Sequence, residues 1–321
     1  MNSQIGKVLT DDQLRILYTK FSNCLPLIRM KKLGVNDIRK LLKSVDCVLM
    51  TQTIAYMISQ EGYVFDGLIG STGLSNSLLY RVFKCNHPAQ VFCAKVYLEE
   101  NKARYEAFVS SMIHDPTPKA GIVKYICIQV KHIHIVQESM ALLMPLYRAS
   151  LEDVLEAFQN NPVPFDYFIK LAKVILAAVS HFHVNDLCHC DIKPANIMVS
   201  AIVLQYLLTI LCKLDDDLSP VLIDFGAVIK FGETVREYTH FYRLDAELNS
   251  VGPEFDLNCV AVTLARCFFP SFELKHRSKA QMIDLLNNIQ DDNLNSYVNV
   301  CVSILDSTLA IDAISRIQLM E

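Results

Sequence analysis

The spacing of hydrophobic and polar residues changes several times along the chain. Between Tyr63 and Val96 it has the short period of β-strands, interrupted by glycines. Further strand-like runs cover residues 121–130 and 140–143. Apolar residues at helical spacing predict helices over 101–113, 151–159, 165–184 and 256–268, followed by weaker helices. This order predicts an α+β chain in which a small β-rich half precedes a larger helical half.

The first 61 residues differ in character and predict a helical N-terminal extension, residues 1–61. Asp11 and Asp12 are suited to cap one helix. Apolar residues from Val35 to Val48 recur at helical spacing in a second helix. Its opposite face is rich in lysine and arginine, which makes it either an ordinary solvated face or a basic docking surface.

Composition bounds the class of protein. A hydrophobic share of 52% with 20% charged residues indicates a folded core. The net charge of -4 gives no sign of a nucleic-acid or anionic-membrane partner. The most apolar run, Ile202–Cys212, is shorter than the ~20 residues of a spanning helix. Scattered cysteines and a polar first segment predict a soluble intracellular protein of the cytoplasm or nucleus.

One loop carries three polar residues at close spacing. In His189–Asn196 these residues are Asp191, Lys193 and Asn196. The aspartate is suited to orient an attacking hydroxyl group and accept its proton, and the lysine to neutralise charge on a moving phosphoryl group. The asparagine amide oxygen is suited to hold magnesium. These three residues therefore predict phosphoryl transfer.

A second carboxylate follows an apolar strand. Residues Val221–Ile223 lead directly into Asp224, whose oxygens suit a hard cation such as Mg²⁺. The His189–Asn196 loop resembles the catalytic loop of protein kinases, and Asp224–Gly226 resembles their D-F-G element. Lys193 with the proline after it is typical of the serine/threonine type.

This resemblance implies a two-lobed protein-kinase-like fold with one active site. Residues 62–147 would form a small β-rich N-lobe, and residues 148–321 a larger helical C-lobe with an insertion at about 200–220. The implied reaction transfers the γ-phosphoryl group of ATP, with Mg²⁺, to serine or threonine hydroxyls of a protein substrate.

The resemblance also assigns an ATP site. Lys95 would contact the phosphates and pair with Glu106, with Glu99 and Glu100 as competing partners. Met144 would border the adenine, and Leu146 or Tyr147 would offer backbone hydrogen bonds. The glycine-rich lid would contain two glycines, Gly70 and Gly73.

Three further residues match supporting positions of the family. Asp256 would anchor the catalytic loop through backbone amides. Arg316 would pair with a glutamate that ends the activation segment, either Glu247 or Glu254.

The sequence departs from the family pattern in several places. Cys190 stands where the family has an arginine that meets a phosphorylated activation loop, so this switch is not expected here. Asp224 comes 33 positions after Asp191, an unusually long interval. The segment around Thr239 and Tyr242 is compressed, which is typical of a rapidly diverging kinase, for example a viral one.

Three other functions stay open at this stage. A pseudokinase, acting as a binding or scaffold module, would explain why the glycine-rich lid has two glycines instead of three and why the activation segment is short. A small-molecule phosphotransferase would share the aspartate-to-asparagine loop. A zinc site at Cys188–Cys190 is the third, although structural zinc normally uses two spaced ligand pairs. The substrate, the regulation and the oligomeric state are not determined by the sequence.

Overall fold

The computed structural model describes part of the chain. The described residues are 62–72, 77–97, 100–113, 126–131, 138–147, 149–158, 161–199, 220–235, 242–244, 250–269 and 278–319. The predicted extension over 1–61 lies outside them, as do nearly all of the predicted insertion and the residues Gly73, Glu99, Thr239 and Glu247.

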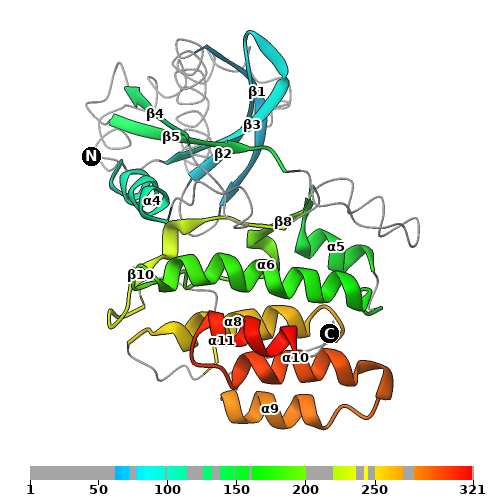
Figure 1. Cartoon of the computed structure of the whole chain (residues 1–321). Helices are drawn as coiled ribbons and strands as arrows, with labels where there is room; N and C mark the ends of the chain where they lie inside the picture. The colour runs from blue at the N-terminus through cyan, green and yellow to red at the C-terminus, as the bar shows by residue number, and fades with distance from the viewer. Residues whose placement is uncertain are drawn as a thin grey trace, which may run out of the picture.

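A five-stranded antiparallel sheet forms one end of the described structure (Figure 1). Its strands are β1 (Tyr63–Thr72), β2 (Ser77–Lys84), β3 (His87–Tyr97), β4 (Ile126–Lys131) and β5 (Glu138–Pro145). They lie in the order β1-β2-β3-β5-β4. Helix α4 (Glu100–Met112) follows β3 and packs against β5. The described residues contain strands within the predicted runs 63–96, 121–130 and 140–143 and a helix over nearly all of 101–113, whereas residues 73–76 and 121–125 lie outside them.

Strand alternation decides which residues of β3 face the helical part of the molecule. Lys95 pairs with Leu142 of β5, and Ala94 pairs with Leu143. Successive side chains point to opposite faces of a sheet. Ala94 and Leu143 accordingly belong to a small core on one face, whereas Leu142 belongs to the main core on the other. Lys95 thus points toward α4 and the helical part.

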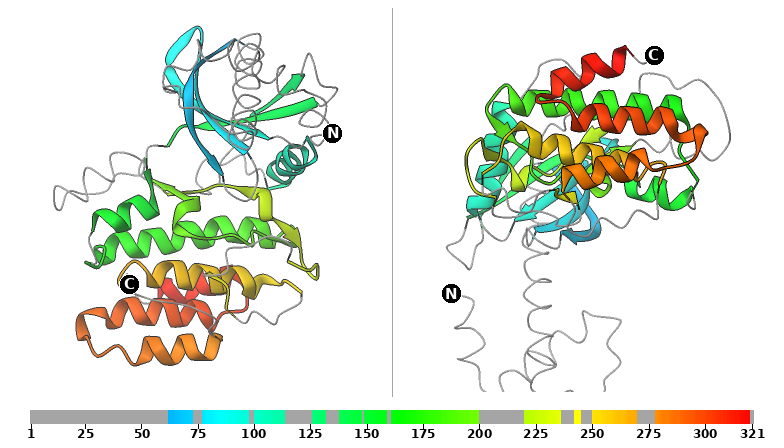
Figure 2. Two further views of the ribbon diagram at one scale, coloured as in Figure 1. Left: turned by 180° about the vertical axis from the view of Figure 1, so that it is seen from behind. Right: turned by 90° about the horizontal axis from the view of Figure 1, so that it is seen from below.

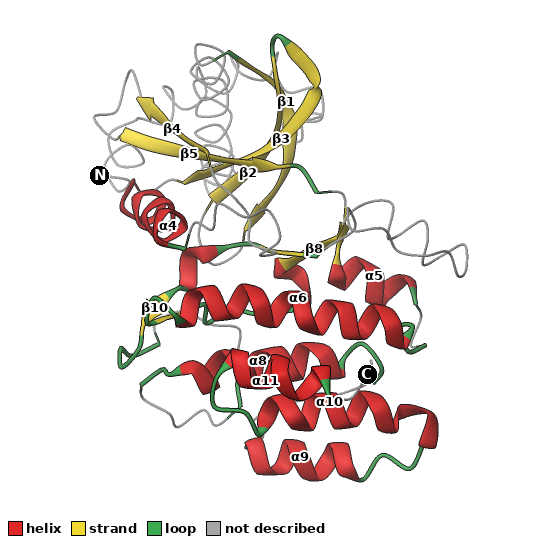
Figure 3. Cartoon of the chain, in the orientation of Figure 1, coloured by secondary structure: helices red, strands yellow, loops and turns green. Residues whose placement is uncertain are grey.

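The helical part fills the other end of the molecule (Figures 1 and 3). Its longer helices are α5 (Leu151–Ala157), α6 (Phe165–His183), α8 (Pro253–Ala265), α9 (Lys279–Asn287), α10 (Asn295–Leu305) and α11 (Ala310–Gln318). Helix α11 packs against α6 and α10, as the view from below shows (Figure 2). None of the helices in the described ranges is long and apolar enough to cross a membrane.

Short strands and single turns lie between the sheet and the helices. They are β6 (Ala149–Ser150), β7 (Leu187–Cys188), η1 (Pro194–Asn196), β8 (Ile197–Val199), β9 (Val221–Leu222), η3 (Phe225–Ala227) and β10 (Ile229–Lys230), with η5 (Asp292–Leu294) further on. Strands β6, β8 and β9 form one small sheet, and β7 pairs with β10. This region contains both loops that the sequence singled out.

Local sequence explains where two helices begin. Ser150 caps α5, because its hydroxyl accepts from the Asp153 amide while the Asp153 carboxylate accepts from the Ser150 amide. This start was predicted. Helix α8 begins at Pro253, three residues before the predicted start at Asp256. The reason is that proline is preorganised for the first helical position.

Helix α8 is buried on all sides. Every residue from Phe255 to Ala265 is buried, including the polar Asp256, Asn258 and Thr263. Such a helix lies in the middle of a core instead of covering its surface. It therefore offers Asp256 as a fixed, desolvated carboxylate beneath the loops between the sheet and the helices.

Candidate active site

A lysine and two carboxylates from three separate elements meet below the sheet. The Lys95 ammonium lies 3.1 Å from Glu106 Oε2 and 2.6 Å from Asp224 Oδ1. The side chains of Lys95 and Glu106 are 2% and 0% exposed, whereas that of Asp224 keeps 24%. Of the three glutamates considered from the sequence, Glu106 is the one whose contact with Lys95 the structure shows.

The charges of this cluster stabilise one another. Burial alone would lower the pKa of Lys95, but Glu106 and Asp224 outweigh it, so the pKa lies above its ordinary value. Burial alone would raise the pKa of Asp224, but Lys95 outweighs it and the pKa lies below its ordinary value. At neutral pH the cluster therefore holds an ammonium beside an ionised, partly exposed carboxylate.

The turn that carries Asp224 is held in an unusual conformation. Asp224 has a left-handed backbone, with φ 67°. The next amide, of Phe225, donates to Glu106 Oε1 at 3.3 Å. The Phe225 ring is fully buried and lies edge-on to the rings of Phe182 and His189. The buried ring and the Glu106 contact thus aim the Asp224 carboxylate at Lys95.

The catalytic-loop residues contact one another directly. Lys193 Nζ lies 2.7 Å from Asp191 Oδ2. Asn196 Nδ2 donates to the same carboxylate oxygen at 2.9 Å and to the Asp191 backbone carbonyl at 2.8 Å. The backbone carbonyl of Asn196 accepts a hydrogen bond at 3.0 Å from the backbone amide of Ile223, the residue directly before Asp224. The three predicted loop residues therefore lie together, and a strand pairing joins them to Asp224.

Asp256 binds the backbone of this loop from below. Its two carboxylate oxygens accept from the amides of His189, at 2.8 Å, and Cys190, at 3.0 Å. Cys190 has φ 65°, a strained conformation for a residue with a side chain. The amide bonds to a buried carboxylate offset this strain. The contact that the sequence predicted for Asp256 is thus present.

The His189 ring ties the two loops together. One ring nitrogen, Nε2, lies 3.2 Å from the carbonyl of Ile223, and the other accepts from the Asp191 amide at 3.3 Å. Burial lowers the pKa of His189 below its ordinary value, although nearby aspartates oppose this effect. A neutral imidazole with one donor and one acceptor nitrogen fits both contacts.

Comparison with known proteins agrees with this geometry. A family model described as "Protein kinase domain" matches residues 80–321, about three quarters of the chain. The chain belongs to the protein kinase family. No curated protein matches it significantly. The family match starts in β2, so the strand with Gly70 lies before the matched residues.

The kinase family uses ATP and usually Mg²⁺, and the residues present fit both. Asp224 supplies an ionised carboxylate with part of its surface exposed. Asn196 uses its amide nitrogen toward Asp191, which leaves the amide oxygen as a ligand atom. Oxygen donors of this kind are what Mg²⁺ prefers. Lys95 adds a cation, which suits phosphate oxygens.

The structure also describes three more of the residues predicted for the ATP site. Met144 is buried and lies on the same face of the sheet as Leu142. Leu146 follows the end of β5, and its amide donates to the Val91 carbonyl at 3.4 Å. Gly70 lies in β1, opposite Leu79. Their roles toward ATP stay predictions.

Arg316 was predicted to pair with a glutamate that ends the activation segment. Arg316 is exposed in the last turn of α11. No ion pair joins it to Glu254, although the structure describes both residues. The alternative partner, Glu247, lies outside the described residues. The predicted pairing with Glu247 therefore stays a prediction.

The cysteines near the catalytic loop do not form an evident zinc site. His183, Cys188 and Asp256 place one possible ligand atom each within 4.8 Å of one another. However, the Cys188 thiol donates to the Gly252 carbonyl, and its pKa is raised by a hydrogen bond to Cys190 and by burial. Asp256 already accepts two amides. A metal would need the thiolate, so this trio fits a structural hydrogen-bond cluster better.

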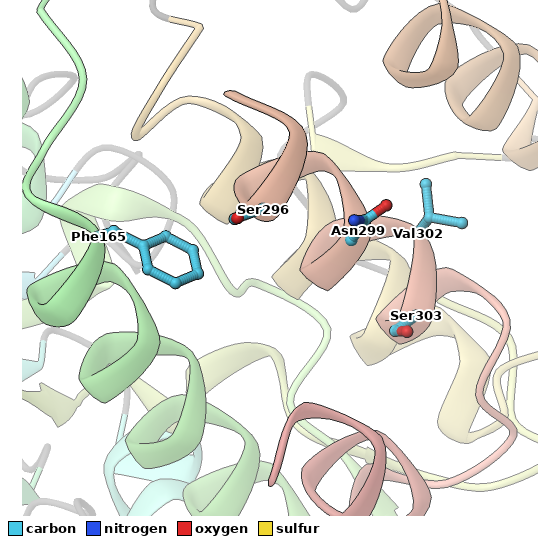
Figure 4. A pocket seen from close by; sticks show the side chains of 5 residues that line it. All are labelled: Phe165, Ser296, Asn299, Val302 and Ser303. Carbon is cyan, nitrogen blue, oxygen red and sulfur yellow. The ribbon is translucent and has the colours of Figure 1, made fainter. Parts of the chain in front are cut away.

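A separate pocket of about 270 Å³ lies between the start of α6 and α10 (Figure 4). It is lined by Phe165, Ser296, Asn299, Val302 and Ser303. None of these side chains is acidic or basic. The pocket therefore lacks the charged groups that phosphoryl transfer requires.

Two contacts in this kinase were missed from the sequence. His183, in the last turn of α6, has Nε2 3.3 Å from Asp256. Tyr105, beside Glu106, donates from its hydroxyl to the Val228 carbonyl at 2.8 Å. Neither partner is near in the chain, so only tertiary structure reveals these contacts. One missed signal was local: apolar Ala103, Val109 and Ile113 mark the buried face of α4 that includes Glu106.

Proposed function

We propose that this chain is an active, ATP- and magnesium-dependent serine/threonine protein kinase with a two-lobed fold. One observation carries the proposal. Lys95 contacts both Glu106 and Asp224 on one side, while Lys193 and Asn196 both contact Asp191 in the adjoining loop.

The residues have distinct tasks in the proposed reaction. Lys95 would bind the phosphates of ATP, held in place by Glu106. Asn196 and Asp224 would hold Mg²⁺, which when bound neutralises phosphate charge. Asp191 would orient the acceptor hydroxyl and take its proton, and Lys193 would stabilise charge on the transferred group. The acceptor O–H bond and the bond between the β- and γ-phosphates break, a new O–P bond forms, and ADP leaves.

The preference for serine and threonine rests on Lys193 and Pro194. Pro194 begins η1 and is buried beneath the loop. The Lys193 side chain is 20% exposed beside Asp191, where an acceptor hydroxyl would arrive. Phosphoamino-acid analysis of a labelled substrate tests this preference, because phosphotyrosine would contradict it.

A pseudokinase is the second candidate. The family match leaves out β1, and the predicted lid has two glycines in place of three. Such a protein would bind ATP without transferring phosphate. The intact contacts of Asp191, Lys193 and Asn196 favour the active enzyme.

The deciding experiment measures transfer of labelled phosphate from ATP with Mg²⁺ to a generic basic protein substrate. Asp191→Asn and Asp224→Asn should each abolish transfer while remaining folded. Asp306→Asn, which changes an exposed aspartate after α10, is the matched control. Binding of Mg-ATP in a thermal-shift assay without transfer would favour the pseudokinase. Transfer that survives in Asp191→Asn would contradict the assigned chemistry.

A further inference from the structure

Two consecutive residues of α4 hold the two ends of the turn after Asp224. Glu106 Oε1 accepts from the Phe225 amide at 3.3 Å, where the turn begins. The Tyr105 hydroxyl donates to the Val228 carbonyl at 2.8 Å, where it ends. The turn η3 between them is thus bound to α4 at both ends.

Helix geometry explains how neighbours reach different ends. Successive side chains of an α-helix are about 100° apart around its axis. Glu106 is fully buried and points toward Lys95, whereas Tyr105 is 39% exposed at the edge of the helix. The phenol is long enough to reach the backbone of the segment that leaves the active site. Figure 1 shows α4 beside this segment, above β10.

The turn needs external contacts because its first residue is strained. Asp224 has φ 67°, a region that non-glycine residues rarely occupy. Such a backbone persists only where its surroundings hold it. The buried Phe225 ring and Glu106 hold the first half, and Tyr105 holds the second half.

The hydrogen bond from the Tyr105 hydroxyl to the Val228 carbonyl, here called the tie, joins two neutral groups. A tyrosine hydroxyl and a backbone carbonyl carry no formal charge at neutral pH. Cys190, next to Asp191, is buried and neutral as well, since its pKa is raised above the ordinary value. The hydrogen bond between Tyr105 and Val228 therefore depends on no formal charge.

We propose that Tyr105 is a positioning residue for phosphoryl transfer. Its hydroxyl keeps the Phe225–Ala227 turn against α4, and so keeps Asp224 beside Lys95. This inference rests on the proposed kinase function. A neutral hydrogen bond shifts an equilibrium by between about twofold and tenfold, which is the size of effect expected on the assembled site.

The test compares two variants that each remove one hydroxyl group. Tyr105→Phe removes the tie and keeps the ring. Tyr167→Phe is the matched control, because the buried Tyr167 hydroxyl has no hydrogen-bond partner within the described structure. We expect kcat/KM for ATP to fall between about twofold and tenfold in Tyr105→Phe only, with KM for the protein substrate unchanged.

Backbone hydrogen exchange gives a readout that does not depend on activity. The amides of residues 226–230 should exchange faster in Tyr105→Phe than in the wild type, and should be unchanged in Tyr167→Phe. Unchanged exchange, unchanged kcat/KM for ATP, or the same loss in both variants would overturn the proposal.

The two proposals fail separately. A wild type that binds Mg-ATP but transfers no phosphate would refute the active kinase. The tie would then be judged by exchange and by the dissociation constant for Mg-ATP, which should rise in Tyr105→Phe. A wild type that neither transfers nor binds would overturn both proposals.

Discussion

Lys95 Nζ lies 2.6 Å from Asp224 Oδ1, although 129 positions separate these residues in the chain. This contact joins the sheet to the loop that leaves the helical part. Because Glu106 contacts the same ammonium, removing Lys95 would leave two carboxylates in a desolvated site without their counter-charge.

Lys95→Met is expected to lower the free energy of unfolding by about 3–5 kcal/mol at pH 7. In the wild type the lowered pKa of Asp224 gives stability that is lost as pH falls below 3.8. In the variant the buried carboxylates would instead have raised pKa values, so protonation would stabilise it. Urea unfolding at pH 7 and pH 4.5 should show a smaller deficit at the lower pH. An equal deficit at both would contradict this account.

Asp256→Asn should weaken the support of the catalytic loop. The amide side chain offers one acceptor where the carboxylate serves the amides of both His189 and Cys190. One amide would lose its partner, at a cost of about 1–3 kcal/mol. We expect a lower unfolding free energy together with a fall in kcat. Asp306→Asn, at an exposed site, should change neither, and equal effects of the two variants would count against the anchor.

Lys193→Ala should act on turnover more than on folding. The lysine is partly exposed and contacts Asp191 at 2.7 Å, so its loss leaves no charge fully buried. Removing one group that stabilises transition-state charge typically lowers kcat by about 10²–10³. Steady-state kinetics should show this fall with KM for ATP nearly constant. Lys84→Ala, on the exposed end of β2, is the control. A kcat equal to that of the wild type would remove Lys193 from the mechanism.

His189 should make the protein less stable as the solution becomes acidic. Burial lowers its pKa below 6.5, so below that pH the unfolded chain binds a proton that the folded chain does not. The free energy of unfolding therefore decreases as the pH is lowered, and His189 contributes at most about 1.4 kcal/mol per pH unit to this decrease. His189→Asn should flatten this slope between pH 7.5 and 5.5 in urea unfolding. A slope in His189→Asn equal to that of the wild type would contradict this account.

Much of the fold and of the candidate site was predictable because it depends on short-range patterns. Strand-like spacing before Lys95 predicts that it lies on a β-strand, as it does in β3. The spacing from Asp191 to Asn196 brings their side chains together within one turn, and Ser150 marks the start of α5.

Other features depended on partners far away in the chain, which local spacing does not specify. The sequence left three glutamates as partners of Lys95, and the buried face of α4 selected Glu106. Tyr105 meets Val228 across 123 positions, and His183 meets Asp256 across 73. Local periodicity fixes which way a side chain points along its own element. Only the packing of elements around the buried helix α8 decides which distant group it meets, because that choice depends on the whole core at once.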